Sequence, residues 1–403
     1  MVSKKVLTFV GAAVAIVALA GCSSGAPAAG GSSGASGGTF NVYMNTPATG
    51  ALANASKANQ EALAVAVDAI NKDGGILGKK VKVTIADDGL DATKAVTLLQ
   101  EQIDKQKPDL VYMGATSNEA LALLPLLTRN KILSTGLVQA HAINDPKSYP
   151  YAFVPYVEGS VDAQAILAKL KSENAKKVAI LTANDANGQS AADSFSAAFK
   201  TAGIAVSAET YAPADLDMTS QLQRLESSKP DALVIQGFGA AVGHILESRT
   251  KLGWDIETLT HSSIGNGQDL SKISKPADWA GIELMVFPLN AGTSDFNKAA
   301  RDSFFASLKS AGSALDQPGH YYALYWDSLH LFKKAAEQAK STDPDKMKAA
   351  LENLKPAASD DQLITFPNEV WTADDHFFNF PADQTFTFVK PGPLVDGAIQ
   401  SVN

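Results

Sequence analysis

The chain carries few of the side-chain patterns that support covalent or metal chemistry. Its six histidines stand at none of the spacings of a zinc site, and no Gly-x-Ser-x-Gly sequence marks a nucleophilic serine. Glycines 237, 239 and 243 follow a predicted strand and open a predicted helix, as in a dinucleotide-binding loop. The acid that such a loop needs at the end of the next strand is missing, since Glu257 stands at that strand's start. We therefore expect no enzyme activity, no metal site and no cofactor.

Two hydroxyl residues, Thr116 and Ser117, stand where a predicted strand gives way to a predicted helix. Residues 110–113 are apolar, and residues 118–129 have helical spacing. A helix N-terminus offers free backbone N–H groups, and hydroxyls beside them suit a carboxylate or carbonyl oxygen. These two residues are therefore candidates for ligand binding. Alternatively, Ser117 only caps the helix, and the two roles can coexist.

The only cysteine, Cys22, closes a stretch with the features of an export signal. Lys4 and Lys5 form a positive start, and residues 6–20 are mostly apolar but too short to span a bilayer. The sequence Leu-Ala-Gly-Cys at 19–22 matches a bacterial lipobox, and residues 23–38 hold only Gly, Ser, Ala and one Pro. We expect a lipoprotein signal peptide over 1–21, and a lipidated Cys22 with a flexible linker over 22–38. The protein would then be anchored on the extracytoplasmic face of the cell membrane. A weak membrane anchor followed by an unmodified cysteine is the alternative.

The composition of the chain after the expected cleavage site excludes several classes of protein. Cleavage before Cys22 would leave 382 residues with a formal charge of −10 and no basic cluster, which argues against nucleic acid as a partner. With no second cysteine there is no disulfide. After Thr39 no run of eighteen apolar residues predicts a membrane span. A body of about 360 residues exceeds what one core usually holds, so we expect two lobes.

Segments with strand and helix character alternate along the chain, which predicts parallel sheets with helices on both faces. The sequence Lys-Pro-Asp at 107–109 enters an apolar strand that ends at Gly114, and Lys-Pro-Asp at 229–231 enters one that ends at Gly237, which suggests two lobes of similar topology. Strands are expected at 39–44, 81–86, 110–113, 131–134, 177–181, 206–211, 232–236, 362–366 and 385–389. Helices are expected at 56–71, 91–105 with Asp91 as its cap, 118–129, 189–202, 219–227, 242–252, 294–311, 321–340 and 345–354.

The order and spacing of four segments resemble the branched-chain amino acid (Leu/Ile/Val) binding proteins, which are type I periplasmic substrate-binding proteins of ABC importers. The segments are residues 68–96, 176–206, 219–253 and 323–351, and the resemblance extends from about Thr39 to Val395. It implies an α/β fold of two doubly wound parallel-sheet lobes joined by a three-crossing hinge. Lobe 1 would comprise 39–156 plus 290–361, and lobe 2 would comprise 157–289 plus 362–403. The ligand would bind in the cleft between them, and the lobes would close on it.

The same resemblance implies where the ligand binds. Amino-acid-binding members hold the ligand carboxylate at two strand ends of the first lobe, here Thr116-Ser117 and Leu137-Val138. This chain has Val138 where those members usually carry Thr, and Asn187 where the family normally shows Tyr. The glutamate that pairs with the ligand ammonium after Gly237 is missing. A free α-amino acid is therefore not favoured, because a buried ammonium without a counter-charge costs several kcal/mol.

The other expected site residues are an acid and three aromatic side chains. Asp185 could replace the missing glutamate, although an Asp at this position more often caps the next helix. Phe238, Tyr156 and Tyr321 are expected to form apolar walls, with core packing as the alternative for Tyr321. We predict a monomeric solute-binding lipoprotein that delivers a small carboxylate, amide or aromatic acid to ABC permease and ATPase subunits. The alternative is a ligand-sensing receptor subunit of a signalling system.

Overall fold

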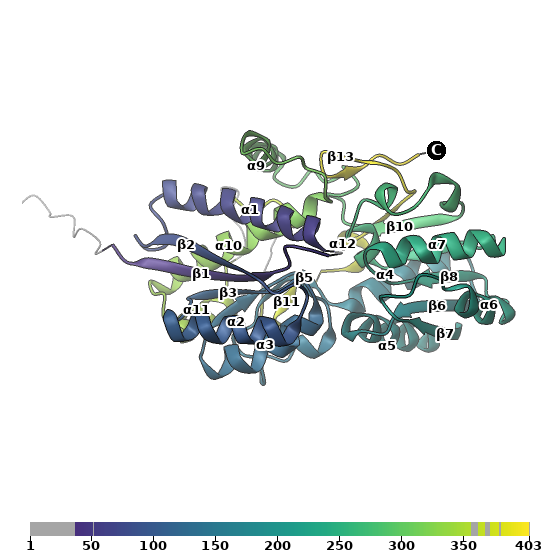
Figure 1. Cartoon of the computed structure of the whole chain (residues 1–403), viewed down its shortest axis with the longest axis horizontal. Coiled ribbons are helices and arrows are strands. Elements are labelled where there is room, and N and C mark those ends of the chain that lie inside the picture. The colour runs from purple at the N-terminus through teal and green to yellow at the C-terminus, as the bar shows by residue number, and fades with distance from the viewer. Residues whose placement is uncertain (1–36, 51, 356–361, 367–370, 379, 403) are drawn as a thin grey trace, which may run out of the picture. The chain divides into compact units, whose positions relative to one another are not determined.

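The first part of the chain builds a four-stranded parallel sheet with the order β2-β1-β3-β4. In the computed structural model, which describes residues 37–50, 52–355, 362–366, 371–378 and 380–402, helices alternate with these strands (Figure 1). Because the strands are parallel, the loops that follow them all lie at one edge of the sheet. The elements are β1 (Thr39–Thr46), α1 (Ala53–Lys72), β2 (Lys80–Asp87), α2 (Ala92–Lys105), β3 (Leu110–Met113), α3 (Ser117–Arg129) and β4 (Leu133–Thr135).

A second sheet has six strands in the order β12-β10-β9-β8-β6-β7. Its pairs are parallel except for β12, which runs antiparallel to β10 at the edge of the sheet. The elements are β6 (Lys177–Ala183), α5 (Ala186–Thr201), β7 (Ala205–Tyr211), α6 (Thr219–Ser227), β8 (Ala232–Ile235), α7 (Ala240–Leu252), β9 (Thr258–Thr260), α8 (Ser262–Gly265), β10 (Ile282–Val286) and β12 (Thr387–Val389), with short 3-10 turns at Leu270–Lys272 and Pro276–Asp278.

Strand β6 shows that both faces of the second sheet are buried. Its side chains alternate between two separate apolar clusters: Val178 and Ile180 belong to one, Ala179 and Leu181 to the other. Successive residues of a strand point to opposite faces, so helices must cover both of them. An almost continuous apolar strand is the result, as expected for a doubly wound sheet.

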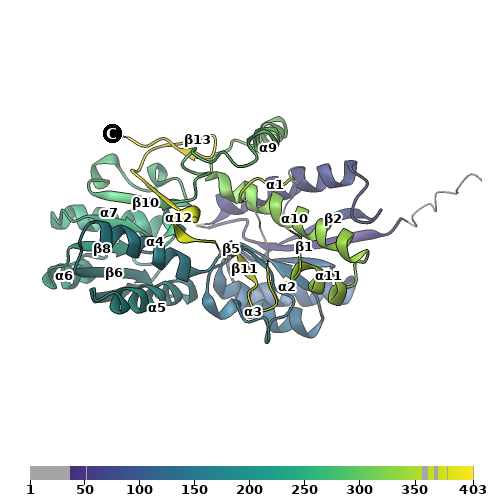
Figure 2. The ribbon, with the colours of Figure 1, turned by 180° about the vertical axis from the view of Figure 1, so that it is seen from behind.

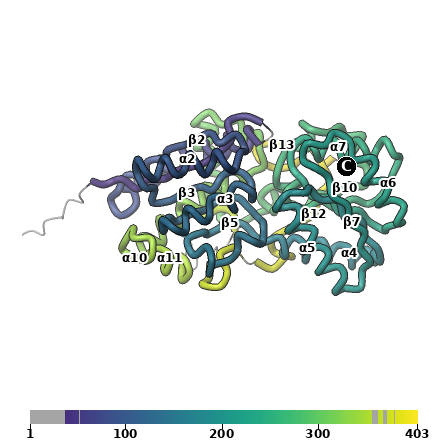
Figure 3. The backbone as a smooth tube through the Cα atoms, turned by 60° about the horizontal axis from the view of Figure 1, so that its bottom comes forward, coloured from purple at the N-terminus to yellow at the C-terminus, as the bar shows by residue number. Residues whose placement is uncertain are grey.

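The chain crosses between the two sheets more than once, as Figures 2 and 3 show. Strand β5 (Val154–Val157) leads to α4 (Gly159–Ser172), which packs on α5, and the chain later returns through α10 (Gly319–Ala339), which packs on α1. The remaining elements are a 3-10 turn at His141–Ile143, α9 (Lys298–Ser310), α11 (Pro344–Leu351), β11 (Phe377–Phe378), α12 (Ala382–Thr385), β13 (Leu394–Val395) and β14 (Ala398–Ile399).

The fold class is confirmed, with two doubly wound α/β sheets. The strand expected at 362–366 is wrong. There the backbone N–H groups of Ile364 and Thr365 donate to the buried carboxylate of Asp327 (2.9 and 2.8 Å) instead of to another strand. The strand expected at 385–389 is shorter, because α12 extends to Thr385.

The expected lobe boundaries stay a prediction. Strand β11 pairs with β5, and the Trp371 indole donates to the carbonyl of Val154 (2.9 Å), so residues 371–378 lie against β5 and not in the six-stranded sheet. Cys22, the signal peptide and most of the linker lie outside the described residues, and their roles stay predictions. Within those residues, no helix combines the length and the apolar character needed to cross a bilayer.

Candidate functional site

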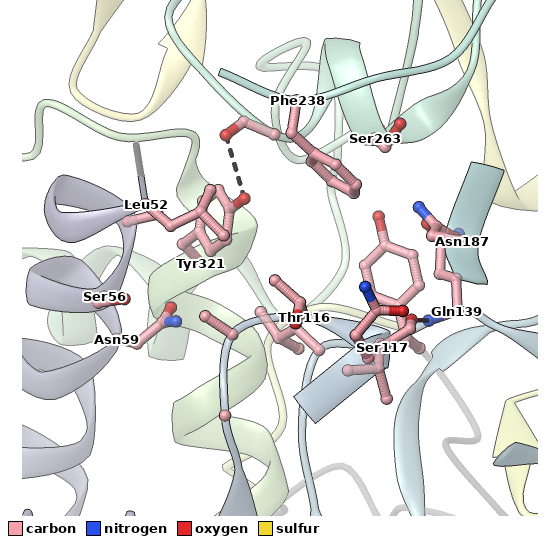
Figure 4. A pocket seen from close by; sticks show the side chains of 18 of the residues that line it. Leu52, Ser56, Asn59, Thr116, Ser117, Gln139, Asn187, Phe238, Ser263 and Tyr321 are labelled. Atoms are coloured by element: carbon pink, nitrogen blue, oxygen red, sulfur yellow. Dashed lines mark hydrogen bonds between the residues drawn. The ribbon is translucent and has the colours of Figure 1, made fainter. Parts of the chain in front are cut away.

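A cavity lies where strands of both sheets end (Figure 4). The first sheet contributes the loops after β3 and β4, the second sheet contributes the loops after β6, β8 and β9, and helices α1 and α10 complete the wall. The cavity has a volume of about 850 Å³ when the open solvent at its mouth is included. This is within the range of small-molecule sites. All nine ligand-binding residues expected from the sequence line it: Thr116, Ser117, Leu137, Val138, Tyr156, Asp185, Asn187, Phe238 and Tyr321.

The hydroxyl and the backbone N–H of Thr116 already donate hydrogen bonds within the protein. Thr116 is the N-cap of α3 in a capping box, and Oε2 of Glu119 accepts from Ala115 N, Thr116 N and Thr116 Oγ1 at 2.8–2.9 Å. Glu119 is fully buried and lies one turn into the helix. Its carboxylate therefore takes the place at this helix N-terminus that a ligand carboxylate was expected to take. The pattern Thr-x-x-Glu is the sequence signal that predicts such a box.

Ser117 remains able to donate a hydrogen bond into the cavity. Its Oγ accepts from the backbone N–H groups of Gln139 and Ala140, both at 3.3 Å. A hydroxyl that accepts these bonds still has its own proton to give. Ser117 thus connects the two strand-end loops of the first sheet and faces the cavity as a neutral donor.

A second carboxyl group, that of Asp88, lies beside Glu119 and is also fully buried. Loss of hydration, together with the neighbouring charge of Glu119, raises the pKa of Asp88 to about 7. One oxygen of each carboxyl, Oδ2 of Asp88 and Oε1 of Glu119, accepts no hydrogen bond from the described residues. A proton shared between those two oxygens would relieve the repulsion, because two adjacent buried carboxylates cannot both ionise cheaply.

The described residues that line the cavity include no lysine or arginine, and Asp185 is their only acid. Asp185 caps α5 through Gly188 N (2.8 Å), which is the alternative role that we considered for it. Burial lowers the pKa of His320 to about 3, so this side chain is neutral. The cavity therefore has no cationic side chain to balance a bound anion and only one carboxylate, already hydrogen bonded, to balance a cation.

Aromatic rings form part of the apolar wall. The ring of Phe238 projects into the cavity, and Tyr321 lies across from it (Figure 4). The Tyr321 hydroxyl donates to the carbonyl of Gly267 (3.0 Å), and burial raises its pKa well above the usual value. The buried rings of Tyr156 and Tyr325 line the same cavity. These faces suit an apolar or aromatic ligand body.

His320 is held as a single tautomer. The backbone N–H of His320 donates to Oδ1 of Asn290 (3.0 Å), so the Asn290 amide nitrogen faces Nδ1 of His320 (3.2 Å) and Oδ1 of Asn266 (2.6 Å). Nδ1 of His320 therefore accepts, and the ring proton stays on Nε2. This buried network holds a neutral histidine side chain in the wall, at a position that the sequence did not predict.

Several direct hydrogen bonds join groups on the two sides of the cavity. The side-chain amide of Gln139, which follows β4, donates to Oδ2 of Asp162 and to Oγ of Ser262, both at 3.3 Å. The backbone N–H of Ala186 donates to Oδ1 of Asn118 (3.3 Å). These contacts link loops of the first sheet to α4, α5 and α8 of the second half, so the two sides of the cavity are closed on each other.

The sequence reasoning missed the contribution of α1. Ser56 and Asn59 lie on its buried side, next to Ala55 and Ala58, and line the cavity. Two polar residues three positions apart on the apolar side of a predicted helix indicate a binding site, because a buried helix face without a function carries few polar side chains. Gln139, Ser263 and His320 also line the cavity and were not among the expected site residues.

The amino-acid sequence matches a family model for periplasmic binding proteins over residues 39–388. Among curated relatives, a Leu/Ile/Val-binding protein of Rhizobium johnstonii is 28% identical over 272 residues, which cover 66% of this chain and 72% of the relative.

Solved structures share the fold. The branched-chain amino acid transporter substrate-binding protein of Streptococcus pneumoniae, in complex with isoleucine, aligns with a TM-score of 0.70 at 23% identity and covers 88% of this chain and 100% of that one. An ABC transporter solute-binding protein of Rhodopseudomonas palustris, in complex with 3,4-dihydroxybenzoic acid, also aligns with a TM-score of 0.70 at 23% identity, over 87% of this chain and 91% of that one.

Proposed function

The chain belongs to the periplasmic binding protein family of the branched-chain amino acid type, and on this premise we propose that it captures a small solute and delivers it to an ABC importer. The observation that carries the proposal is the cavity at the strand ends of both sheets, where all nine expected residues meet. A ligand in it contacts both halves, and only closure of the two halves completes its contacts. Permease and ATPase subunits of the importer are the partners. The relatives are binding proteins, and the proposal likewise gives this chain no enzymatic role.

The lining favours an uncharged solute with an apolar or aromatic body. Isoleucine and 3,4-dihydroxybenzoic acid are ligands of two proteins that share this fold, but at 23% identity they say nothing of this chain's ligand. No acid follows Gly237 at the position where an ammonium would need one, and Thr116 already donates to Glu119. A neutral solute avoids both charge problems. Ser117 and Asn187 are the proposed polar contacts, and Phe238, Tyr156 and Tyr321 are the proposed walls, with Leu137 and Val138.

Anchoring to the membrane is part of the same proposal. A lipid on Cys22 and a linker over 23–38 would keep the binding domain on the extracytoplasmic face, close to a membrane-embedded permease. A chain of sixteen such residues has a root-mean-square span of about 20–24 Å. The tether would therefore let the domain reach the permease without leaving the membrane surface.

Uptake and mass spectrometry test this function. The full chain, purified without unfolding, should carry a bound solute, which mass spectrometry identifies after the protein is denatured. A strain lacking the gene should lose uptake of that solute. Unchanged uptake together with loss of a transcriptional response would favour the sensing alternative. Unchanged uptake and an unchanged response, with no solute on the protein, would contradict both roles.

A further inference from the structure

Two side chains of α1 that line the cavity each carry a buried polar atom without a partner. Ser56 is 1% exposed and Asn59 is 5% exposed, and neither Oγ of Ser56 nor Oδ1 of Asn59 has a hydrogen-bond partner among the described residues. Both side chains line the cavity, on the side that α1 forms (Figure 4). A buried polar atom that has lost its water and found no protein partner costs free energy, so each such group requires an explanation.

The protein itself does not satisfy these atoms. A serine hydroxyl in a helix often donates to the carbonyl four residues earlier, but Ser56 makes no such bond. The side chain of Asn59 lies beside the Tyr325 phenol and opposes the rise of its pKa, as a group that donates to the phenol oxygen does. The amide nitrogen of Asn59 therefore faces Tyr325, and Oδ1 does not. The free atoms are therefore one acceptor, Oδ1 of Asn59, and one hydroxyl that can donate or accept.

These atoms discriminate between ligand end groups. A carboxylate cannot donate to Oδ1 of Asn59, and the two oxygens would repel each other. An ammonium can donate, but the only acid among the described lining residues, Asp185, already accepts from Gly188 N, so no free carboxylate balances the charge. A primary amide or a hydroxyl donates to Asn59 and accepts from Ser56 without a charge.

On the opposite side, Asn187 presents a complementary atom. It is 6% exposed, it lies in the first turn of α5, and its Nδ2 donates to no described residue. Figure 4 shows Asn187 on the far side of the cavity from Ser56 and Asn59, with Phe238 and Tyr321 lining the space. An oxygen acceptor on the second end of the ligand would satisfy Nδ2.

We propose that α1 forms an end-group subsite in which Asn59 Oδ1 accepts from, and Ser56 Oγ donates to, a primary amide or hydroxyl group of the solute. This inference rests on the proposed function and names the chemical class of its ligand. The aromatic rings hold the apolar body, and Asn187 donates to an oxygen at the other end if the solute carries one. Specificity then comes from unpaired neutral atoms and not from a charge.

Matched probes test the subsite. Calorimetry on the full chain in mild detergent compares two series, each with the same carbon skeleton. The first is phenylacetamide, 2-phenylethanol, phenylacetate and phenethylamine, and the second is 4-methylpentanamide, 4-methylpentanol, 4-methylpentanoate and 4-methylpentylamine. We expect the amide or the alcohol of at least one series to bind at least tenfold more tightly than the carboxylate and the amine. The proposal is overturned if a carboxylate or amine is the tightest ligand, or if no amide or alcohol binds with a Kd below 1 mM.

Variants of α1 locate the effect. Asn59→Asp keeps the shape and should shift the preference toward the amine by at least tenfold, and Ser56→Ala should weaken amide binding by about tenfold. Lys57→Ala, whose side chain is 71% exposed on the same helix, is the matched control and should bind as the parent does. Melting temperatures check that each variant folds. Unchanged preferences in both variants would place the end group elsewhere.

The two proposals can fail separately. If the strain lacking the gene loses uptake of a solute that carries only a carboxylate or an ammonium, solute capture stands and the α1 subsite is wrong. If uptake is unaffected and the purified chain carries no solute, the proposed function itself is wrong.

Discussion

Replacement of Asp88 by asparagine should change how stability depends on pH. Asp88 is buried beside Glu119, and its pKa is raised from 3.8 to about 7, first by burial and then by the charge of Glu119. The buried Tyr43 on β1 lies near Asp88, and Asp87 adds further negative charge. Between pH 3.8 and about 7 the folded protein binds more protons than the unfolded chain does, so its free energy of unfolding falls as the pH rises.

The size of the effect follows from the pKa difference between the two states. One pH unit of separation corresponds to about 1.4 kcal/mol, so a separation from 3.8 to about 7 amounts to roughly 4 kcal/mol. The free energy of unfolding has fallen by this full amount above about pH 7, and below pH 3.8, the pKa of Asp88 in the unfolded chain, it has not fallen. The introduced amide would be neutral at every pH and could donate to Glu119 in place of the Asp88 proton. The Asp88→Asn variant should therefore melt higher than the parent at pH 8, by roughly 4–8 °C, and close to the parent at about pH 4.

Calorimetry at about pH 4 and pH 8 measures this difference directly. Asp87→Asn is the matched control, because Asp87 is exposed and accepts from the backbone N–H groups of Ala48 and Gly89 (2.9 and 3.0 Å), which lower its pKa. It should not gain stability at pH 8. Equal melting temperatures of Asp88→Asn and the parent at pH 8, or a lower one for the variant, would refute the reasoning and indicate that folding does not raise the pKa of Asp88.

Four further predictions concern the cavity and the anchor. Ser117→Ala should weaken binding of the released native solute by roughly ten- to a hundredfold in calorimetry, because a hydrogen bond to a polar ligand atom is lost. Glu158 lies outside the cavity lining, so Glu158→Ala is the control and should bind the solute as the parent does. Phe238→Ala should weaken binding at least tenfold because an apolar wall is removed, and an unchanged affinity would contradict its role. Saturating solute should lower the radius of gyration in small-angle scattering, whereas a constant radius would argue against closure. Cys22→Ala should abolish labelling by a lipid probe; equal labelling of parent and variant would exclude lipidation of Cys22.

Local patterns were enough to predict most of the secondary structure. Asp91 caps α2 as expected, accepting from Thr93 N and Lys94 N (2.8 and 3.0 Å), and α6 has the expected bounds of 219 and 227. Periodicity and caps depend on residues within a few positions of each other, so a sequence displays them directly. The resemblance to the Leu/Ile/Val-binding proteins then identified nine residues, scattered along the chain, that line one cavity.

The sequence by itself determined the fold class, the family and the edge of each sheet where the site lies. Tertiary structure alone decided which polar atoms at that edge are already paired. Asp88 meets Glu119 from a different element, Gln139 reaches Asp162 across the cavity, and Asp327 takes the backbone groups that a strand at 362–366 would have used. Such partners come from distant elements, and local periodicity carries no information about them. For the same reason the unpaired oxygens of Ser56 and Asn59 could be identified only when every neighbour of α1 was in place.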